Sequence, residues 1–245
     1  MSDSAFGPVA RHYDDLMASI PYAMWLDYVR LLFAYQGVRP VTVLDVCCGT
    51  GTICEMMREV GYRPTGIDLS PGMIAQAQSK AAEKGFAIDY HVADATCFDL
   101  GQTFDAAISL FDSLNYITTA EGLRCALTQV AKHLRPGGSL VFDLNTAYAF
   151  EQEMFTQEDM RKRAKVRYRW TSDWDPATRL IRVHMKFWVG EESFEETHTQ
   201  RAHPLEEVEA LLRETGFEQI RSYHSYTLDP VRARSDRVHF AAIRR

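Results

Sequence analysis

The chain has 245 residues, of which 46% are apolar and 24% are charged, and its formal net charge at pH 7 is -6. This composition is ordinary for a soluble globular protein, and the length suffices for one large domain or for one domain with an insertion. The acidic balance argues against general nucleic-acid binding, which needs a basic surface to displace counterions. No apolar run reaches membrane-spanning length and the first residues lack a signal-peptide core, so we expect a cytoplasmic protein without a membrane partner.

The chain has five cysteines, an odd number, and none of them forms a CxxC pair. This pattern is typical of small buried residues in a reducing compartment rather than of disulfides or metal ligands. We therefore expect no metal site.

Extended and helical patterns alternate in the first part of the chain. Ser70 is expected to cap a helix that starts at Pro71 and ends at Gly85, and Thr118 is expected to start a capping box for the next helix. Such an alternation at short spacing predicts a doubly wound parallel sheet with helices on both faces. The predicted strands are 41–46, 63–68, 87–92, 104–111 and 139–144, and the predicted helices are 23–36, 51–60, 70–85 and 121–134.

The pattern changes after Asn145. The runs 165–170 and 179–189 alternate polar and apolar residues with a period of two, and a third extended run covers 193–203. These runs predict an antiparallel three-stranded layer, inserted as residues 146–203 into a domain made of residues 1–145 and 204–245. After it, the α/β rhythm returns as a helix at 204–216 and strands at 217–228 and 237–245.

A glycine turn follows the first predicted strand, in VLDVCCGTGT (43–52). A strand, a glycine turn and a helix are a common start of a nucleotide-binding domain. The dinucleotide fingerprint G-x-G-x-x-G, begun at Gly49, fails at Cys54, where the third glycine would allow close packing around a pyrophosphate. This counts against a nicotinamide dinucleotide.

Acidic residues follow three of the predicted strands. Asp45, Asp68 and Asp94 lie at or just after strand ends, and no Lys or Arg accompanies the glycine turn. A carboxylate at Asp68 can accept both hydroxyls of a ribose, and one at Asp94 can accept from an adenine amine. Leu69 and Phe111 are placed to flank an adenine ring. The set suits a ligand with a positive charge and no phosphate.

The motifs VLDVCCGTG (43–51), GIDLS (66–70) and VADA (92–95) together resemble those of the class I S-adenosylmethionine (SAM) methyltransferases. The chain departs from the family's usual D-x-G-x-G-x-G at Cys47, where glycine is more common. The resemblance covers about residues 40–145 and the C-terminal helix and strands. It implies a Rossmann-like, doubly wound, mixed sheet of seven strands with the last one, 237–243, antiparallel. It also implies SAM as the cofactor, with S-adenosylhomocysteine as its product.

The resemblance also implies roles for single residues. Asp45 holds the glycine turn and reaches the SAM amino group through water, Asp68 binds the ribose, and Asp94 with the Ala95 backbone binds adenine. Tyr13, in a helical gate formed by residues 1–36, closes over the cofactor; the alternative is an amphipathic helix that packs Tyr13 and Leu16. The predicted cofactor-binding set is Tyr13, Asp45, Cys47, Cys48, Gly49, Gly51, Asp68, Leu69, Asp94, Ala95, Leu110 and Phe111.

The segment LFDSLNYI (110–117) follows the fourth strand and is similar to a segment of bacterial small-molecule methyltransferases. Because ligands bind beyond the carboxyl ends of strands in open α/β sheets, Asp112, Asn115 and Tyr116 are expected near the transferred methyl group. The alternatives are loop capping for Asp112 and Ser113 and core packing for Tyr116.

The inserted layer is the predicted substrate lid. Its third strand lacks an apolar face beyond Phe194, so it is either an exposed edge strand or it turns His198, Gln200 and Arg201 toward a polar pocket. Arg201 would then bind an anionic substrate group, with a surface salt bridge as the alternative. The predicted catalytic set is Tyr13, Asp112, Asn115, Tyr116, His198 and Arg201.

The run RKRAKVRYR (161–169) holds six basic residues, either an RNA-facing stripe or a solvated face. Because the chain is acidic and the run alternates, we favour the solvated face. The leading hypothesis is therefore methyl transfer from SAM to nitrogen or oxygen of a small molecule. RNA or protein methylation, an NAD-dependent oxidoreductase and a non-catalytic SAM-binding protein are the alternatives.

Overall fold

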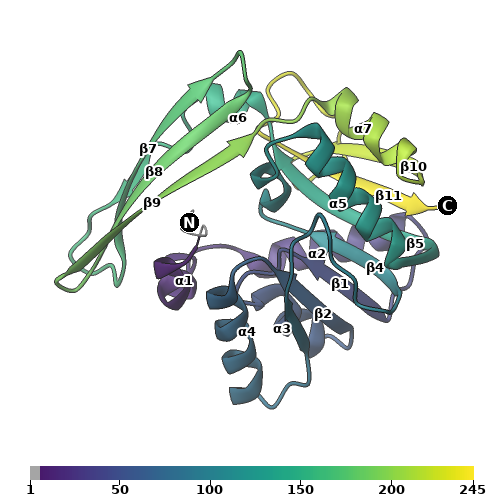
Figure 1. The fold of residues 1–245 in the computed structure, drawn as a ribbon, viewed down its shortest axis with the longest axis horizontal. Helices are drawn as coiled ribbons and strands as arrows, with labels where there is room; N and C mark the ends of the chain where they lie inside the picture. Colours follow the sequence, from purple (N-terminus) through teal and green to yellow (C-terminus); the bar gives the residue numbers. More distant parts are fainter. Residues whose placement is uncertain (1–5) are drawn as a thin grey trace.

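The computed structural model describes residues 6–245 as a seven-stranded mixed sheet with flanking helices and a separate four-stranded antiparallel sheet (Figure 1). The helices are η1 (3₁₀, Pro8–His12), α1 (Tyr13–Leu16), α2 (Tyr22–Tyr35), α3 (Thr52–Glu59), α4 (Pro71–Glu83), η2 (3₁₀, Ser113–Tyr116), α5 (Ala120–Lys132), α6 (Ala147–Glu151) and α7 (Leu205–Glu214). The strands are β1 (Thr42–Val46), β2 (Arg63–Asp68), β3 (Asp89–Val92), β4 (Phe104–Ser109), β5 (Leu134–Asn145), β6 (Gln157–Asp159), β7 (Arg167–Asp175), β8 (Leu180–Val189), β9 (Glu192–Arg201), β10 (Phe217–His224) and β11 (Arg237–Arg244).

The large sheet has the strand order β10-β11-β5-β4-β1-β2-β3. Strands β1 to β5 pair in parallel, whereas β11 runs antiparallel to both of its neighbours, β5 and β10. The predicted doubly wound sheet with an antiparallel last strand is therefore confirmed. Its parallel strands bring their carboxyl ends to one edge, where Asp45, Asp68 and the segment after β4 meet.

Helices cover both faces of this sheet. On one face, Leu123 and Leu127 of α5 and Leu212 of α7 pack with Phe142 of β5 in a fully buried cluster. On the other face, the apolar stripe of α2 and residues of α3 pack against β1, β4 and β5. Each such side chain contributes about 1.5–3 kcal/mol by its burial. Within residues 6–245, no helix combines the length and apolar character needed to cross a membrane.

Two helix caps show how local sequence sets element boundaries. The Ser70 Oγ accepts a hydrogen bond from the Met73 amide at 3.3 Å, and Pro71 opens α4, as predicted. The prediction for α5 is wrong by one residue: Thr119, not Thr118, caps the helix and accepts from the Gly122 amide at 3.0 Å. Helix α5 starts at Ala120, so Thr119 holds the N-cap position.

The inserted segment forms four strands, in the order β6-β7-β8-β9, rather than the three predicted. The additional strand, β6, has only three residues and no apolar alternation, so the period-two pattern could not reveal it. The inner face of the sheet packs its own apolar cluster, to which Val9 of η1 and Phe150 of α6 belong. Figure 1 shows this sheet in green extending away from the large sheet, with α1 below it.

Candidate active site

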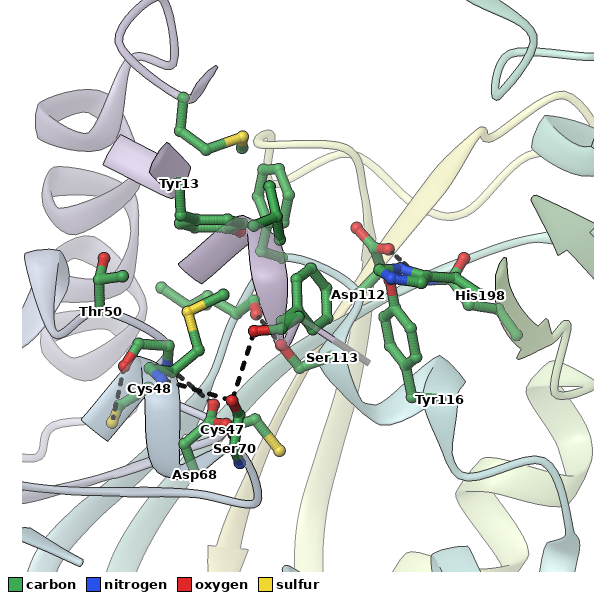
Figure 2. Close-up of a pocket in the computed structure, with 18 of the residues that line it drawn as sticks. Tyr13, Cys47, Cys48, Thr50, Asp68, Ser70, Asp112, Ser113, Tyr116 and His198 are labelled. Carbon is green, nitrogen blue, oxygen red and sulfur yellow. Dashed lines mark hydrogen bonds between the residues drawn. The ribbon is translucent and has the colours of Figure 1, made fainter. Parts of the chain in front are cut away.

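A cavity of about 790 Å³ lies between three parts of the chain. Its walls are the carboxyl edge of the large sheet, the N-terminal segment from Phe6 to Trp25, and the inner face of the second sheet. This volume lies within the range of sites for cofactors and small ligands. Figure 2 shows Cys47, Cys48, Asp68 and Ser70 on one side of the cavity, and Asp112, Tyr116 and His198 on the other.

The glycine turn after β1 has an unusual backbone. Cys47 (φ 64°), Gly49 (φ 56°) and Gly51 (φ 75°) all adopt the left-handed conformation. A side chain on Gly51 would also collide with the Tyr90 hydroxyl, so this position requires glycine. Cys47 occupies the position where the methyltransferase motif usually has glycine, and it holds a conformation that is strained for any residue with a Cβ.

The Asp68 carboxylate organises this turn. Its two oxygens accept hydrogen bonds from the backbone amides of Gly49 and Ser70, each at 2.9 Å. Burial raises the pKa of the Asp68 carboxyl, and these two amides act in the opposite direction. One carboxylate therefore joins the glycine turn to the start of α4.

Two further acids line the same edge. The Asp45 side chain is buried, and its Oδ2 accepts a hydrogen bond from the Cys54 thiol at 3.3 Å. Burial raises the pKa of Asp45 to about 7. The Asp94 Oδ1 accepts from the amide and the hydroxyl of Thr96, at 2.8 and 2.7 Å. Beside them, Leu69 leaves 62% of its surface exposed and Ala95 lines the cavity, so an apolar surface accompanies the acids.

The loop after β4 carries a second strained backbone. Phe111 (φ 65°) and Asp112 (φ 50°) are consecutive non-glycine residues in the left-handed region. Asp112 accepts from Arg237 at 2.8 Å and from the Gln200 amide at 2.6 Å, and Arg237 also contacts Asp143. Burial raises the pKa of Asp112, while Arg237 and Gln200 act in the opposite direction. Asp112 therefore takes part in a buried ion cluster that bridges the two sheets.

Three side chains form a hydrogen-bonded row at the far end of the cavity. The Tyr116 hydroxyl lies 2.9 Å from Nδ1 of His198, and Nε2 of His198 lies 2.8 Å from Oε2 of Glu196. Tyr116 and His198 both line the cavity. The third strand of the inserted layer is thus an edge strand, and it also turns His198 and Gln200 into the pocket.

The N-terminal segment covers the cavity. Tyr13 lines it, packs edge-on against Phe6 with ring centroids 5.8 Å apart, and has its pKa raised by burial. The neighbouring Asp14 accepts from the Thr50 hydroxyl at 2.5 Å and pairs with Lys80 at 2.6 Å. The gate segment is thereby tied to the glycine turn.

Three predicted site residues do not line the described cavity. Gly51 caps α3 just behind the turn. The Asn115 amide donates to the carbonyls of Asn145 and Arg201, at 3.0 and 2.8 Å, and so joins η2 to both sheets. Arg201 forms a two-pronged ion pair with Glu207, which matches the salt-bridge alternative. The other predicted cofactor-binding and catalytic residues line the cavity, and their roles stay predictions.

Sequence reasoning did not place Phe6, Trp170, Glu196 or Arg237 in the site. The alternation of Glu196, His198 and Gln200 along β9 was the one available signal, because it puts all three on one face. The basic run behaves as a solvated face: Arg161, Lys165 and Arg169 pair with Asp159, Asp15 and Glu158, respectively.

The acidic groups at the sheet edge fit SAM. Carboxylates suit ribose hydroxyls and a cationic ligand, and the open space above Gly49 leaves room for a ligand against the turn. Among the described residues that line the cavity, Arg237 is the single Lys or Arg, and two aspartates already contact it. The edge therefore suits a nucleoside that carries no phosphate.

Comparisons with known proteins agree with this geometry. A family model described as "Methyltransferase domain" matches residues 43–138. The chain is 34% identical to the "Putative methyltransferase YqeM" of Bacillus subtilis (strain 168), over 94% of this chain and 93% of that protein. A crystal structure of an S-adenosylmethionine-dependent methyltransferase from Clostridium acetobutylicum ATCC 824 superposes with a TM-score of 0.85 at 25% identity, covering 96% of this chain and 97% of the other.

A second solved structure is the sugar N-methyltransferase KedS8 from Streptoalloteichus sp ATCC 53650. It superposes with a TM-score of 0.77 at 26% identity, and the match covers 94% of this chain and 90% of the other. The full-length sequence relative, the domain match and the shared architecture give the same result. The chain belongs to the class I S-adenosylmethionine-dependent methyltransferases.

Proposed function

We propose that the protein transfers the methyl group of SAM to a nitrogen, or an oxygen, of a small-molecule acceptor. The observation that carries this proposal is one continuous cavity that joins the acidic sheet edge to a chamber, the part of the cavity under the inner face of the second sheet. The edge suits the cofactor, and the chamber is left for the acceptor. SAM supplies an electrophilic methyl group on a positively charged sulfur.

In this proposal the residues of the sheet edge hold the cofactor. Asp68 accepts the ribose hydroxyls, Asp94 and the Ala95 backbone bind adenine, and Leu69 with Phe111 flanks its ring. The turn with Cys47, Cys48 and Gly49 adjoins the methionine part, near Asp45. Tyr13 and Leu110 close the site over it.

Methyl transfer from a sulfonium disperses charge in the transition state, so the protein mainly aligns the acceptor and excludes water. The second sheet suits both tasks, and residues 146–203 are proposed as the substrate lid. Tyr168, Trp170 and Met185 of its inner face line the chamber. Within the described residues, the buried atoms Trp170 Nε1, Asn145 Nδ2 and Gln200 Oε1 lack hydrogen-bond partners, and the three residues line the cavity.

The charges favour a neutral or cationic acceptor over an anionic one, and we take nitrogen as the preferred nucleophile. The Arg237 guanidinium is already paired with Asp112 and lies against Asp143, so it leaves little attraction for an anion. KedS8 is itself a sugar N-methyltransferase, which supports nitrogen as the acceptor.

Incubation with methyl-labelled SAM and a fractionated bacterial extract tests the proposed function. We expect label in the small-molecule fraction, because the cavity has the volume of a small-molecule site and is walled by the second sheet and the N-terminal segment. Label confined to the RNA or protein fraction would contradict the proposal.

Asp68→Ala should weaken SAM binding about 10–100-fold, because it removes a carboxylate that makes charge-assisted hydrogen bonds. Isothermal titration calorimetry measures this loss, and circular dichroism shows whether the variant is folded. Asp89→Ala removes a carboxylate from the exposed start of β3 and should leave the affinity unchanged. Unchanged affinity in a folded Asp68→Ala protein would rule out the ribose assignment.

The affinity for SAM should rise between about pH 6 and about pH 8. The pKa of Asp45 is about 7 in the free protein, and a cationic ligand favours its ionised form, so binding strengthens as pH rises through this value. Asp45→Asn should flatten this rise when Kd is measured across the range. Asp68 is retained in both proteins, so the difference between them isolates Asp45; equal slopes would refute its titration.

Trp170→Ala should raise the KM for the acceptor about 10–100-fold while leaving the Kd for SAM unchanged, since it removes an apolar wall of the chamber only. Initial rates with the labelled acceptor from the fractionation experiment give the KM. Arg169→Ala, on the opposite face of β7, is the matched control. A parallel loss of SAM affinity would show that the second sheet serves the cofactor site instead.

A further inference from the structure

Glu196 is a buried acid that the cofactor site does not use. It lies on the inner face of β9, and its side chain is only 7% exposed. Its Oε1 accepts from the Val9 amide at 3.1 Å, and its Oε2 accepts from the Phe6 amide at 3.0 Å and faces Nε2 of His198 at 2.8 Å. Its three nitrogen partners hold this carboxylate in a fixed position and compensate its charge, which would be costly to bury unpaired.

The partners of this row set the direction of its hydrogen bonds. Both Glu196 oxygens are acceptors, so the ring nitrogen that faces Oε2 donates, and His198 carries its proton on Nε2. In the neutral ring, Nδ1 then has a free lone pair. The Tyr116 hydroxyl, 2.9 Å away, donates to it. The oxygen of Tyr116 keeps its own lone pairs, and Tyr116 borders the chamber.

We propose that Tyr116, His198 and Glu196 form a proton relay that accepts the proton of the methyl acceptor, with Glu196 as the positioning residue that orients His198. This inference rests on the proposed function and deepens it. It assigns an acceptor whose nucleophilic atom bears a proton, such as an amine or a hydroxyl. The row has the order of a hydroxyl, an imidazole and a carboxylate, and the hydroxyl of Tyr116 is the group in contact with substrate.

The proposed step moves one methyl group and two protons. The acceptor atom forms its bond to the methyl carbon with its own electron pair, and the carbon–sulfur bond breaks with its pair going to sulfur, which yields S-adenosylhomocysteine. The acceptor's proton passes to the oxygen of Tyr116 while the phenol proton passes to Nδ1 of His198. The imidazolium is then paired with the Glu196 carboxylate, and it returns its proton to water when the product leaves.

The relay explains why a tyrosine alone does not suffice as the base. Burial, with the nearby Asp112 and Glu196, raises the pKa of Tyr116 well above its ordinary value, so a lasting phenolate is disfavoured. Passing the proton on to His198 places the positive charge next to a carboxylate instead of leaving a negative charge on the phenol. The Phe6 ring, with its centroid 4.5 Å from that of His198 and 5.6 Å from that of Tyr116, covers the row.

The row also depends on the N-terminal segment. Oε2 of Glu196 faces His198 and accepts from the Phe6 amide, and Oε1 accepts from the Val9 amide, so the segment and the relay share one anchor. A purely structural Glu196 would therefore fasten the gate, and its loss would weaken SAM binding through Tyr13. A positioning Glu196 would in addition change turnover at saturating SAM.

Nuclear magnetic resonance of the full-length protein labelled with ¹⁵N-histidine tests the direction of the row. We expect His198, assigned by its absence in His198→Asn, to carry its proton on Nε2 alone at about pH 8. A proton on Nδ1, or on both nitrogens, would overturn the relay, because Nδ1 could not then accept from Tyr116.

Single-turnover and steady-state rates test the catalytic role. The probe is methyl-labelled SAM with the low-molecular-mass filtrate of a bacterial lysate. Tyr116→Phe and His198→Asn should lower kcat at least about 100-fold, the usual contribution of a general base, with the Kd for SAM within about twofold. Glu196→Gln should lower kcat in the same way. Glu195→Gln is the matched control, because Glu195, the neighbour of Glu196 on β9, points outward and pairs with Lys186.

The outcomes separate the two proposals. Transfer by the wild-type protein with near-normal kcat in Tyr116→Phe and His198→Asn would overturn the relay and leave the proposed function standing. A Glu196→Gln protein that keeps its kcat at saturating SAM would show that Glu196 only anchors the N-terminal segment and would overturn the positioning role, whatever its SAM affinity. Absence of label from every small molecule with the wild-type protein would contradict the proposed function itself, and the relay with it.

Discussion

The buried contacts of Arg237 with Asp112 and Asp143 hold the working parts of the protein together. Arg237 comes from β11, Asp143 from β5 and Asp112 from the loop after β4, and Gln200 of the second sheet donates to Asp112. Removal of one partner from such a group leaves a buried charge without compensation, which typically costs about 3–5 kcal/mol. The group thereby holds Phe111 and Asp112 in left-handed backbone conformations that neither would adopt on its own. Position of the second sheet, shape of the chamber and strain in the loop all depend on it.

The cavity is divided by chemistry as well as by elements. Carboxylates and main-chain amides dominate at the sheet edge, where Asp68 and Asp94 accept from backbone or hydroxyl donors and Asp45 accepts from the Cys54 thiol. The opposite wall is aromatic and comes from one face of β7 and β8. In the proposed function, the cofactor and the acceptor can therefore occupy one cavity without competing for the same groups. The row of Tyr116, His198 and Glu196 lies at the far end of the cavity, where the proposed relay would accept a proton.

Local patterns predicted the sheet, its crossing helices and the acids at its edge, because the period of apolar residues and the ends of parallel strands follow from neighbours in sequence. Asp45, Asp68 and Asp94 could be placed in this way. Contacts between residues far apart in sequence could not: the amides that bind Glu196 come from residues 187 and 190 positions away, and Arg237 reaches Asp112 across 125. Arg201 was expected in the pocket beside its neighbour Gln200, yet successive strand residues point to opposite faces, and only Gln200 points inward. The short β6 offered no period to detect.

The N-terminal segment is attached at two places, one to the glycine turn and one to the second sheet. Asp14 binds the hydroxyl of Thr50 in the glycine turn, and the amides of Phe6 and Val9 bind Glu196 of β9. Lifting the segment would break both sets of hydrogen bonds, so in the proposed function cofactor and acceptor enter and leave through the same opening. Exchange of spent cofactor and departure of the methylated compound then become a single opening event. An acceptor that needs two successive methyl groups would then either dissociate or stay bound in an open site while the cofactor is exchanged.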